Sequence, residues 1–197
     1  MVEDRLRTPL AGWRPSRSLY MFAIVPPQPF YDEVRALQKE IAERYDTHEA
    51  LRRPVHITLI PPFESEHEEE HQLIKFTTEF AATRSHFTID IHGFGQFRER
   101  VIYVRPIESE PLMHMRDALK DAFRLHFPLL TPRQSHDEFH PHITIGYRDL
   151  THAGFQHAWP EYEKRPFERQ FSVESIVLLR HDGRWVEVTS ARLASSE

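Results

Sequence analysis

Two histidines of this sequence each begin a copy of the same four-residue pattern. His56 opens His-Ile-Thr-Leu in the first half of the chain, and His142 opens His-Ile-Thr-Ile in the second half. Side chains alternate between the two faces of a β-strand. If the first copy is a strand, His56 and Thr58 share one face and the apolar residues point into a core. The second copy places His142 and Thr144 in the same relation.

These residue types can carry out proton transfer. Imidazole titrates near physiological pH, so it can both accept and donate a proton. Two histidines that face each other can act as base and acid on opposite sides of one reacting centre, and threonine hydroxyls can donate hydrogen bonds to phosphate oxygens. One copy could be coincidence in a chain with 14 histidines, but two copies in alternating apolar frames favour a functional pair. We therefore predict that His56 and His142 are catalytic.

The two motifs and their flanks resemble those of the two-histidine (2H) phosphoesterase superfamily, in its bacterial 2'-5' RNA ligase-like branch. The resemblance runs from about residue 18 to the end of the chain and is specific at the motifs. It implies a phosphoesterase that acts on 2',3'-cyclic phosphate or 2'-5' linkages of RNA ends or small nucleotides. It also implies that Thr58 and Thr144 bind the phosphate. The stretches that carry it are YMFAIVPP (20–27), RPVHITL (53–59), PPF (61–63) and FHPHITIGY (139–147).

The mechanism expected from this resemblance needs no metal and no cofactor. One motif histidine removes a proton from water or a ribose hydroxyl, and the other gives a proton to the leaving ribose oxygen. The sequence does not say which histidine is the base, nor whether hydrolysis or ligation is the physiological direction. A second hypothesis is a non-catalytic nucleotide or RNA-end binding protein on the same fold.

Further substrate contacts are expected next to the motifs. In the family that the chain resembles, aromatic and basic residues near the motifs help to hold base and phosphate. Tyr147 and Arg148 follow the second motif and are therefore candidates, although Arg148 would equally suit a surface ion pair. Arg52 and Arg53 have a weaker claim of the same kind. His140 is a candidate for substrate or metal binding or for a structural role.

One rival motif points to zinc. His67-Glu-Glu-Glu-His71 matches the H-E-x-x-H pattern of zinc peptidases. Its surroundings are wrong, because the whole stretch is polar and lies where a helix is predicted to begin. Acidic residues there are explained by the helix dipole. We expect a solvated helix end, not a metal site.

Composition narrows the class of protein. The chain has 197 residues, which suits one domain, and no apolar run approaches the roughly 20 residues that span a bilayer. The absence of cysteine excludes disulfides and thiolate catalysis, and it fits a cytoplasmic protein. A net charge of −5 argues against a broad basic surface, so a short RNA end or a small nucleotide is the expected ligand. No protein partner is evident, and a monomer is expected.

The elements predicted around the motifs form an α+β fold. We expect a two-lobed duplicated unit, with antiparallel sheets lining a central cleft and helices packed outside. Residues 1–17 are expected to form an N-terminal arm and residues 18–197 a single domain. Phe63 is expected in the core more than as a base-stacking residue. The predicted strands are 18–25, 55–60, 87–97, 101–107, 142–147 and a closing hairpin of 167–179 with 184–188, and the predicted helices are 29–45, 65–83, 112–127 and 151–164.

Overall fold

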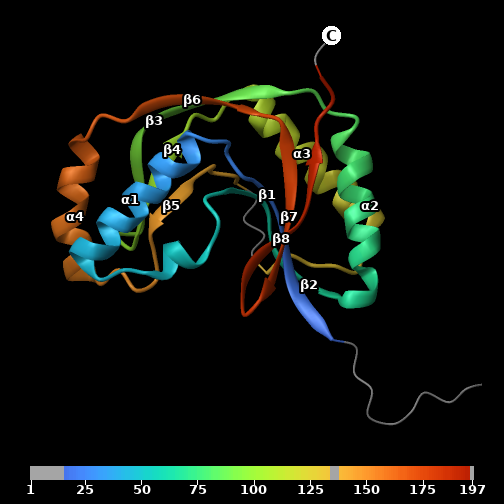
Figure 1. Ribbon diagram of the computed structural model, residues 1–197, viewed down its shortest axis with the longest axis horizontal. Helices are drawn as coiled ribbons and strands as arrows, with labels where there is room; N and C mark the ends of the chain where they lie inside the picture. The colour runs from blue at the N-terminus through green and yellow to red at the C-terminus, as the bar shows by residue number, and fades with distance from the viewer. Residues whose placement is uncertain (1–15, 134–137, 196–197) are drawn as a thin grey trace, which may run out of the picture.

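The computed structural model describes residues 16–133 and 138–195, which form eight strands and four α-helices (Figure 1). The strands are β1 (Arg17–Ile24), β2 (Ile57–Glu66), β3 (Phe87–Phe97), β4 (Val101–Pro106), β5 (Ile143–Gly146), β6 (Glu168–Val173), β7 (Ser175–Asp182) and β8 (Arg184–Arg192). The helices are α1 (Phe30–Tyr45), α2 (Glu70–Ala81), α3 (Glu110–His126) and α4 (His152–Lys164), with the short 3-10 helices η1 (Glu49–Arg52) and η2 (His67–Glu69).

The strands form two antiparallel four-stranded sheets. The first has the order β2-β1-β7-β8 and the second has the order β5-β4-β3-β6. Each motif strand, β2 or β5, lies at the edge of its sheet. The predicted α+β class with antiparallel sheets and outer helices is confirmed.

Two of the helices pack on the sheet that contains neither the strand before them nor the strand after them in the sequence. Helices α2 and α3 pack on the first sheet, whereas α1 and α4 pack on the second (Figure 1). Helix α1 lies between β1 and β2 in the sequence, yet it packs on β5 of the other sheet. Helix α3 lies between β4 and β5 and packs on β2. Each motif strand is therefore covered by a helix from the other half of the chain.

The apolar motif residues occupy the core as the alternation predicts. Ile57, Ile143 and Ile145 are fully buried, and the threonines between them are only half-buried. Burial of a side chain of this size stabilises the fold by about 1.5–3 kcal/mol. Phe63 is also fully buried and its ring lies 4.7 Å from that of Phe123, which confirms its place in the core.

The first motif strand is longer than predicted. The predicted strand 55–60 stops before Pro61-Pro62, but β2 continues through both prolines to Glu66. Proline lacks a backbone donor, which an edge strand tolerates on its outer side. The predicted helix start at Ser65 is also wrong, because Ser65 lies in β2. Glu66 and Glu69 form the capping box instead and open η2.

The predicted closing hairpin is also different. The stretch 167–179 is not one strand, because it divides at Glu174 into β6 of the second sheet and β7 of the first. Only β7 pairs with β8. At the other end of the chain, β1 begins at Arg17, one residue before the predicted strand 18–25, and residues 1–15 of the predicted arm lie outside the described residues. Of the loop after α3, residues 134–137 also lie outside them.

Within the described ranges, no helix has the length and apolar character needed to cross a membrane.

Candidate active site

The two motif histidines are held in the same way. Each precedes the first residue of its strand, and each uses Nδ1 to bond the carbonyl oxygen two residues earlier. The distance is 2.7 Å from His56 to Pro54 and 2.8 Å from His142 to His140. A carbonyl oxygen only accepts hydrogen bonds, so Nδ1 must carry the hydrogen. In both copies, therefore, Nε2 is the atom that gains and loses a proton.

Both imidazoles are neutral in the unliganded site near pH 7. The pKa of His56 is lowered from 6.5 to about 4, and burial is the main cause. Repulsion from the charge of Arg53 and from a protonated His142 adds to this shift, and the hydrogen bond to the Pro54 carbonyl opposes it. Burial also lowers the pKa of His142. A proton on His142 would disfavour a proton on His56, so the two imidazoles from the two sheets lie within electrostatic reach of each other.

Helix α1 positions both motifs through two side chains that the sequence analysis did not select. Arg35 donates to the carbonyl oxygens of Leu51 and Arg53, at 3.2 and 2.7 Å, and so holds the segment before His56. Gln38 is buried and donates from Nε2 to the carbonyl oxygen of Thr144 at 2.8 Å. Gln38 could have been found, because it is an amide within the apolar stripe of a predicted helix.

Arg53 and Tyr147, candidates from the two motifs, meet in the structure. The Arg53 guanidinium carbon lies 5.6 Å from the centre of the Tyr147 ring and 5.9 Å from that of Trp185 on β8. The exposed Arg148 lies over the same tyrosine at 5.2 Å. Arg52 does not join this group, because it is exposed and pairs with Glu49 at 2.9 Å.

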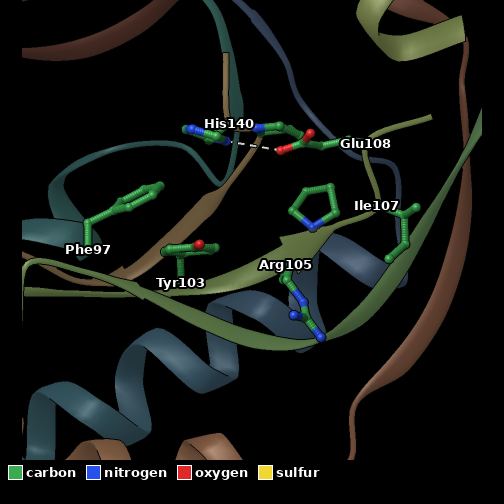
Figure 2. A pocket seen from close by; sticks show the side chains of 8 residues that line it. Phe97, Tyr103, Arg105, Ile107, Glu108 and His140 are labelled. Atoms are coloured by element: carbon green, nitrogen blue, oxygen red, sulfur yellow. Dashed lines mark hydrogen bonds and ion pairs between the residues drawn. The ribbon is translucent and has the colours of Figure 1, made fainter. Parts of the chain in front are cut away.

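A recess of about 490 Å³ is lined by His140 and Pro141, the two residues before His142, and by the rings of Phe97 and Tyr103; Figure 2 shows its side chains. The stacked rings of Phe97 and Tyr103, with centres 4.5 Å apart, form one side, and the ring centre of His142 lies 5.1 and 5.6 Å from theirs. Across the recess, His140 bonds Glu108 at 3.1 Å, which raises the pKa of His140 (Figure 2). The two rings had been predicted only as strand residues.

Glycine at position 95 makes room for this aromatic wall. Gly95 pairs with Tyr103 across β3 and β4, and a Cβ atom there would collide with the tyrosine ring. The position therefore has no space for a side chain while the ring keeps its place.

A second recess of about 310 Å³ is also lined by Phe97, together with three arginines. The turn between β3 and β4 and the residues after β5 form its walls, so it borders the end of the second motif strand. Its lining residues are Phe97, Arg98, Arg100, Val101, Tyr147 and Arg148.

The two histidines of the rival zinc motif form hydrogen bonds with different partners. His67 bonds the Ser18 hydroxyl through Nε2 at 2.7 Å, and His71 bonds the Glu68 carbonyl through Nδ1 at 2.8 Å. In the part of the chain that the structure describes, no three His, Asp or Glu residues are grouped to hold a metal ion. His140 likewise belongs to no such group.

Comparison with known proteins gives one family. Residues 26–185 match the model of the 2'-5' RNA ligase superfamily. A protein of Geobacillus sp. (strain WCH70) is 28% identical over 170 residues, which cover 84% of this chain and 91% of that protein. A protein of Bacillus mycoides (strain KBAB4) is 30% identical over 166 residues, covering 82% and 89%. Both carry the name "Putative phosphoesterase".

Solved structures show the same fold. The protein TT0787 of Thermus thermophilus matches with a TM-score of 0.67 at 16% identity, over 91% of this chain and 100% of that one. Escherichia coli LigT in complex with 3'-AMP matches with a TM-score of 0.60 at 21% identity, over 91% and 99%. LigT has also been solved with NADP+ and with ATP.

Proposed function

The chain belongs to the 2'-5' RNA ligase superfamily, and we propose that it is a phosphodiesterase acting on 2',3'-cyclic phosphates or 2'-5' linkages of RNA ends or small nucleotides. Family and fold support a two-histidine phosphoesterase. The observation that carries the proposal is the matched pair of Nδ1 hydrogen bonds, which leaves Nε2 of His56 and of His142 free for proton transfer.

In the proposed reaction, one imidazole acts as base and the other as acid. The neutral histidine removes through Nε2 a proton from water or a ribose hydroxyl, and that oxygen attacks phosphorus in line. The bond from phosphorus to the ribose oxygen breaks, and the protonated histidine gives its proton to that oxygen. The second imidazole gains its charge when the anionic substrate binds, since a nearby negative charge favours the protonated form. Ligation is the same chemistry with a ribose hydroxyl as nucleophile.

The residues around the histidines would bind the substrate. Thr58 and Thr144 are half-buried on the strands that the histidines precede, so their hydroxyls would donate to the phosphoryl oxygens and stabilise charge in the transition state. Tyr147 and Arg148 would hold base and phosphate. Crystal complexes of LigT with 3'-AMP, NADP+ and ATP support a nucleotide as the ligand class.

The experiment that tests the proposal removes the imidazoles in turn. Turnover of 2',3'-cyclic mononucleotides, 2'-5' dinucleotides and cyclic-phosphate RNA ends is measured for His56→Ala, His142→Ala and the double variant. Each single change should lower kcat by about 10²–10⁴-fold. The double variant should be scarcely worse, because the two groups act on one step.

His114→Ala is the matched control, because that imidazole is exposed on α3. A single variant with a near-normal rate under saturating substrate would end the assignment of that histidine. Nucleotide binding by the unmodified protein without any turnover would establish the non-catalytic alternative instead.

A further inference from the structure

Three arginines from two separate loops converge on the second recess. Arg98 and Arg100 stand in the turn between β3 and β4, and Arg148 follows β5. All three are exposed. Among residues 16–133 and 138–195, no carboxylate lies within ion-pair distance of any of their guanidinium groups. Of the acids next to them in the sequence, Glu99 lies 3.9 Å from His152, and Asp149 accepts hydrogen bonds from the Thr47 hydroxyl and from the backbone N–H groups of His48 and Glu49.

This grouping of charge is unusual for the molecule as a whole. The chain has a net charge of −5, yet three arginines line one recess, and none of them makes an ion pair with a carboxylate in the described ranges. Like charges so placed repel one another, and a bound anion removes that repulsion. Guanidinium groups present a planar fork of donors that matches phosphate oxygens. The recess is therefore suited to an anion with several oxygens.

The backbone at these positions supports a role for the side chains. Arg98 has φ of 49°, Glu99 of 54° and Arg148 of 58°, a left-handed conformation that is unfavourable for residues with a Cβ atom. Arg98 and Glu99 are the central residues of the hairpin turn that Arg100 closes by donating its backbone N–H to the Phe97 carbonyl oxygen at 3.0 Å, and Asn-Gly would fit these two positions with less strain. Arginine at two strained positions is therefore not explained by the turns, and a local strain of this kind points to function.

The recess is adjacent to the proposed reaction centre. The Phe97 ring forms a wall of both recesses, and its centre lies 5.1 Å from that of the His142 ring. The volume of 310 Å³ compares with about 30 Å³ for one water molecule, so a phosphate group fits. A phosphate bound there would be separate from the one between the histidines, yet on the same ligand.

We propose that Arg98, Arg100 and Arg148 bind a second phosphate of the substrate. The inference rests on the proposed function and narrows it: the preferred substrate is an oligonucleotide end, and not a lone cyclic mononucleotide. The second phosphate is the diester of the neighbouring nucleotide. A 5'-phosphate on the reacting nucleotide has the same chemistry and is separated from it in the test.

The test compares three substrates that share one 2',3'-cyclic phosphate. The first is a nucleoside cyclic phosphate, the second carries an added 5'-phosphate, and the third is a dinucleotide. The protein should prefer the dinucleotide over the mononucleotide in kcat/KM by about 10–100-fold, the scale of a hydrogen bond between charged groups. Arg98→Asn with Arg100→Gln should bring this ratio close to one. Asparagine is chosen because it tolerates the left-handed backbone at position 98.

Arg124→Gln is the matched control. It removes one arginine charge from an exposed site on α3 that lines neither recess, and it should keep the ratio of the unmodified protein. Equal kcat/KM for all three substrates, or a loss in the double variant that is equal for all three, would overturn the inference. If the cyclic phosphate with an added 5'-phosphate is preferred as strongly as the dinucleotide, the result supports a second phosphate site. It would overturn the inference that this site binds the diester of the neighbouring nucleotide.

Binding measurements keep the two proposals distinguishable. Dissociation constants are measured for a nucleoside 3'-phosphate and for a dinucleotide with a 3'-phosphate, which need no turnover. Tighter binding of the dinucleotide that is lost with Arg98 and Arg100 supports the recess even if no substrate is turned over, a result that would refute only the proposed function. Equal binding of both ligands would refute the recess.

Discussion

At the residue scale, the two motif histidines are placed by backbone carbonyls and kept neutral by burial. The carbonyls of Pro54 and His140 select the Nδ1–H form in both copies. The lowered pKa of each imidazole leaves Nε2 unprotonated until an anion binds. We therefore expect the pH profile of kcat, which reports the complex, to lie at higher pH than the profile of kcat/KM, which reports the free enzyme.

The lowered pKa of His56 predicts a pH-dependent stability. The group titrates near 4 in the folded protein and near 6.5 when unfolded, so between these values the unfolded chain binds more protons. The free energy of unfolding should be level above pH 6.5 as far as His56 is concerned, and should fall as the pH drops toward 4. His56→Gln should lose less stability than the unmodified protein between pH 7 and 4.5, as measured by urea unfolding. His114→Gln should behave as the unmodified protein, and identical losses in all three would contradict the assignment.

At the scale of elements, helix α1 joins the two halves of the site. It reaches the segment before His56 through Arg35 and the second motif strand through Gln38. Because α1 packs on β5 while its chain continues into β2, its position sets the relation between the two motifs. A shift of α1 would therefore move one histidine relative to the other.

Removing the amide of Gln38 should loosen this relation. Gln38→Met keeps the length of the side chain and leaves the Thr144 carbonyl without its partner, at a cost of about 1–3 kcal/mol in unfolding free energy. Because Thr144 belongs to the second motif, kcat/KM should fall as well. Gln170→Met is the control, since that amide bonds Asp90 on an exposed surface. Unchanged stability and kinetics in Gln38→Met would show that the helix is held in place by packing alone.

At the scale of the whole molecule, α1 and α3 each pack on the motif strand of the other half of the chain, so the proposed site draws on both sheets. The zinc-like motif is not part of this arrangement. Helix α2, which continues from His67 and its neighbours, packs on β7 and β8 of the first sheet (Figure 1). The proposed reaction requires two imidazoles and hydroxyl groups and assigns no task to His67 or His71.

Prolonged chelation should therefore leave turnover unchanged. The double variant His67→Ala with His71→Ala should also retain the rate, with at most a small loss of stability from the bond between His67 and Ser18. Turnover is measured before and after chelation and again with added zinc. If chelation abolishes the activity, added zinc restores it and the loss of His67 removes it, the metal mechanism would be established in place of the paired histidines.

Features that depend on neighbours along the chain could be predicted from the amino-acid sequence alone. The alternation in the motifs predicted that Ile57 and Ile143 are buried, because successive side chains of a strand point to opposite faces. The two neighbouring strands predicted at 87–97 and 101–107 and the four helices followed from equally local patterns, apart from their ends. The motifs also identified the family, since the two four-residue patterns are specific even where the rest of the chain has diverged.

Which of these segments meet became visible only in the folded chain. The sequence pattern does not show that 167–179 divides at Glu174 into strands of two different sheets, because the pairing of each strand depends on residues far away in the sequence. The same holds for the rings of Phe97 and Tyr103 against His142, and for the arginines gathered at the second recess. Local periodicity reports which face of an element is buried, whereas the partner on that face is set by the packing of the whole chain.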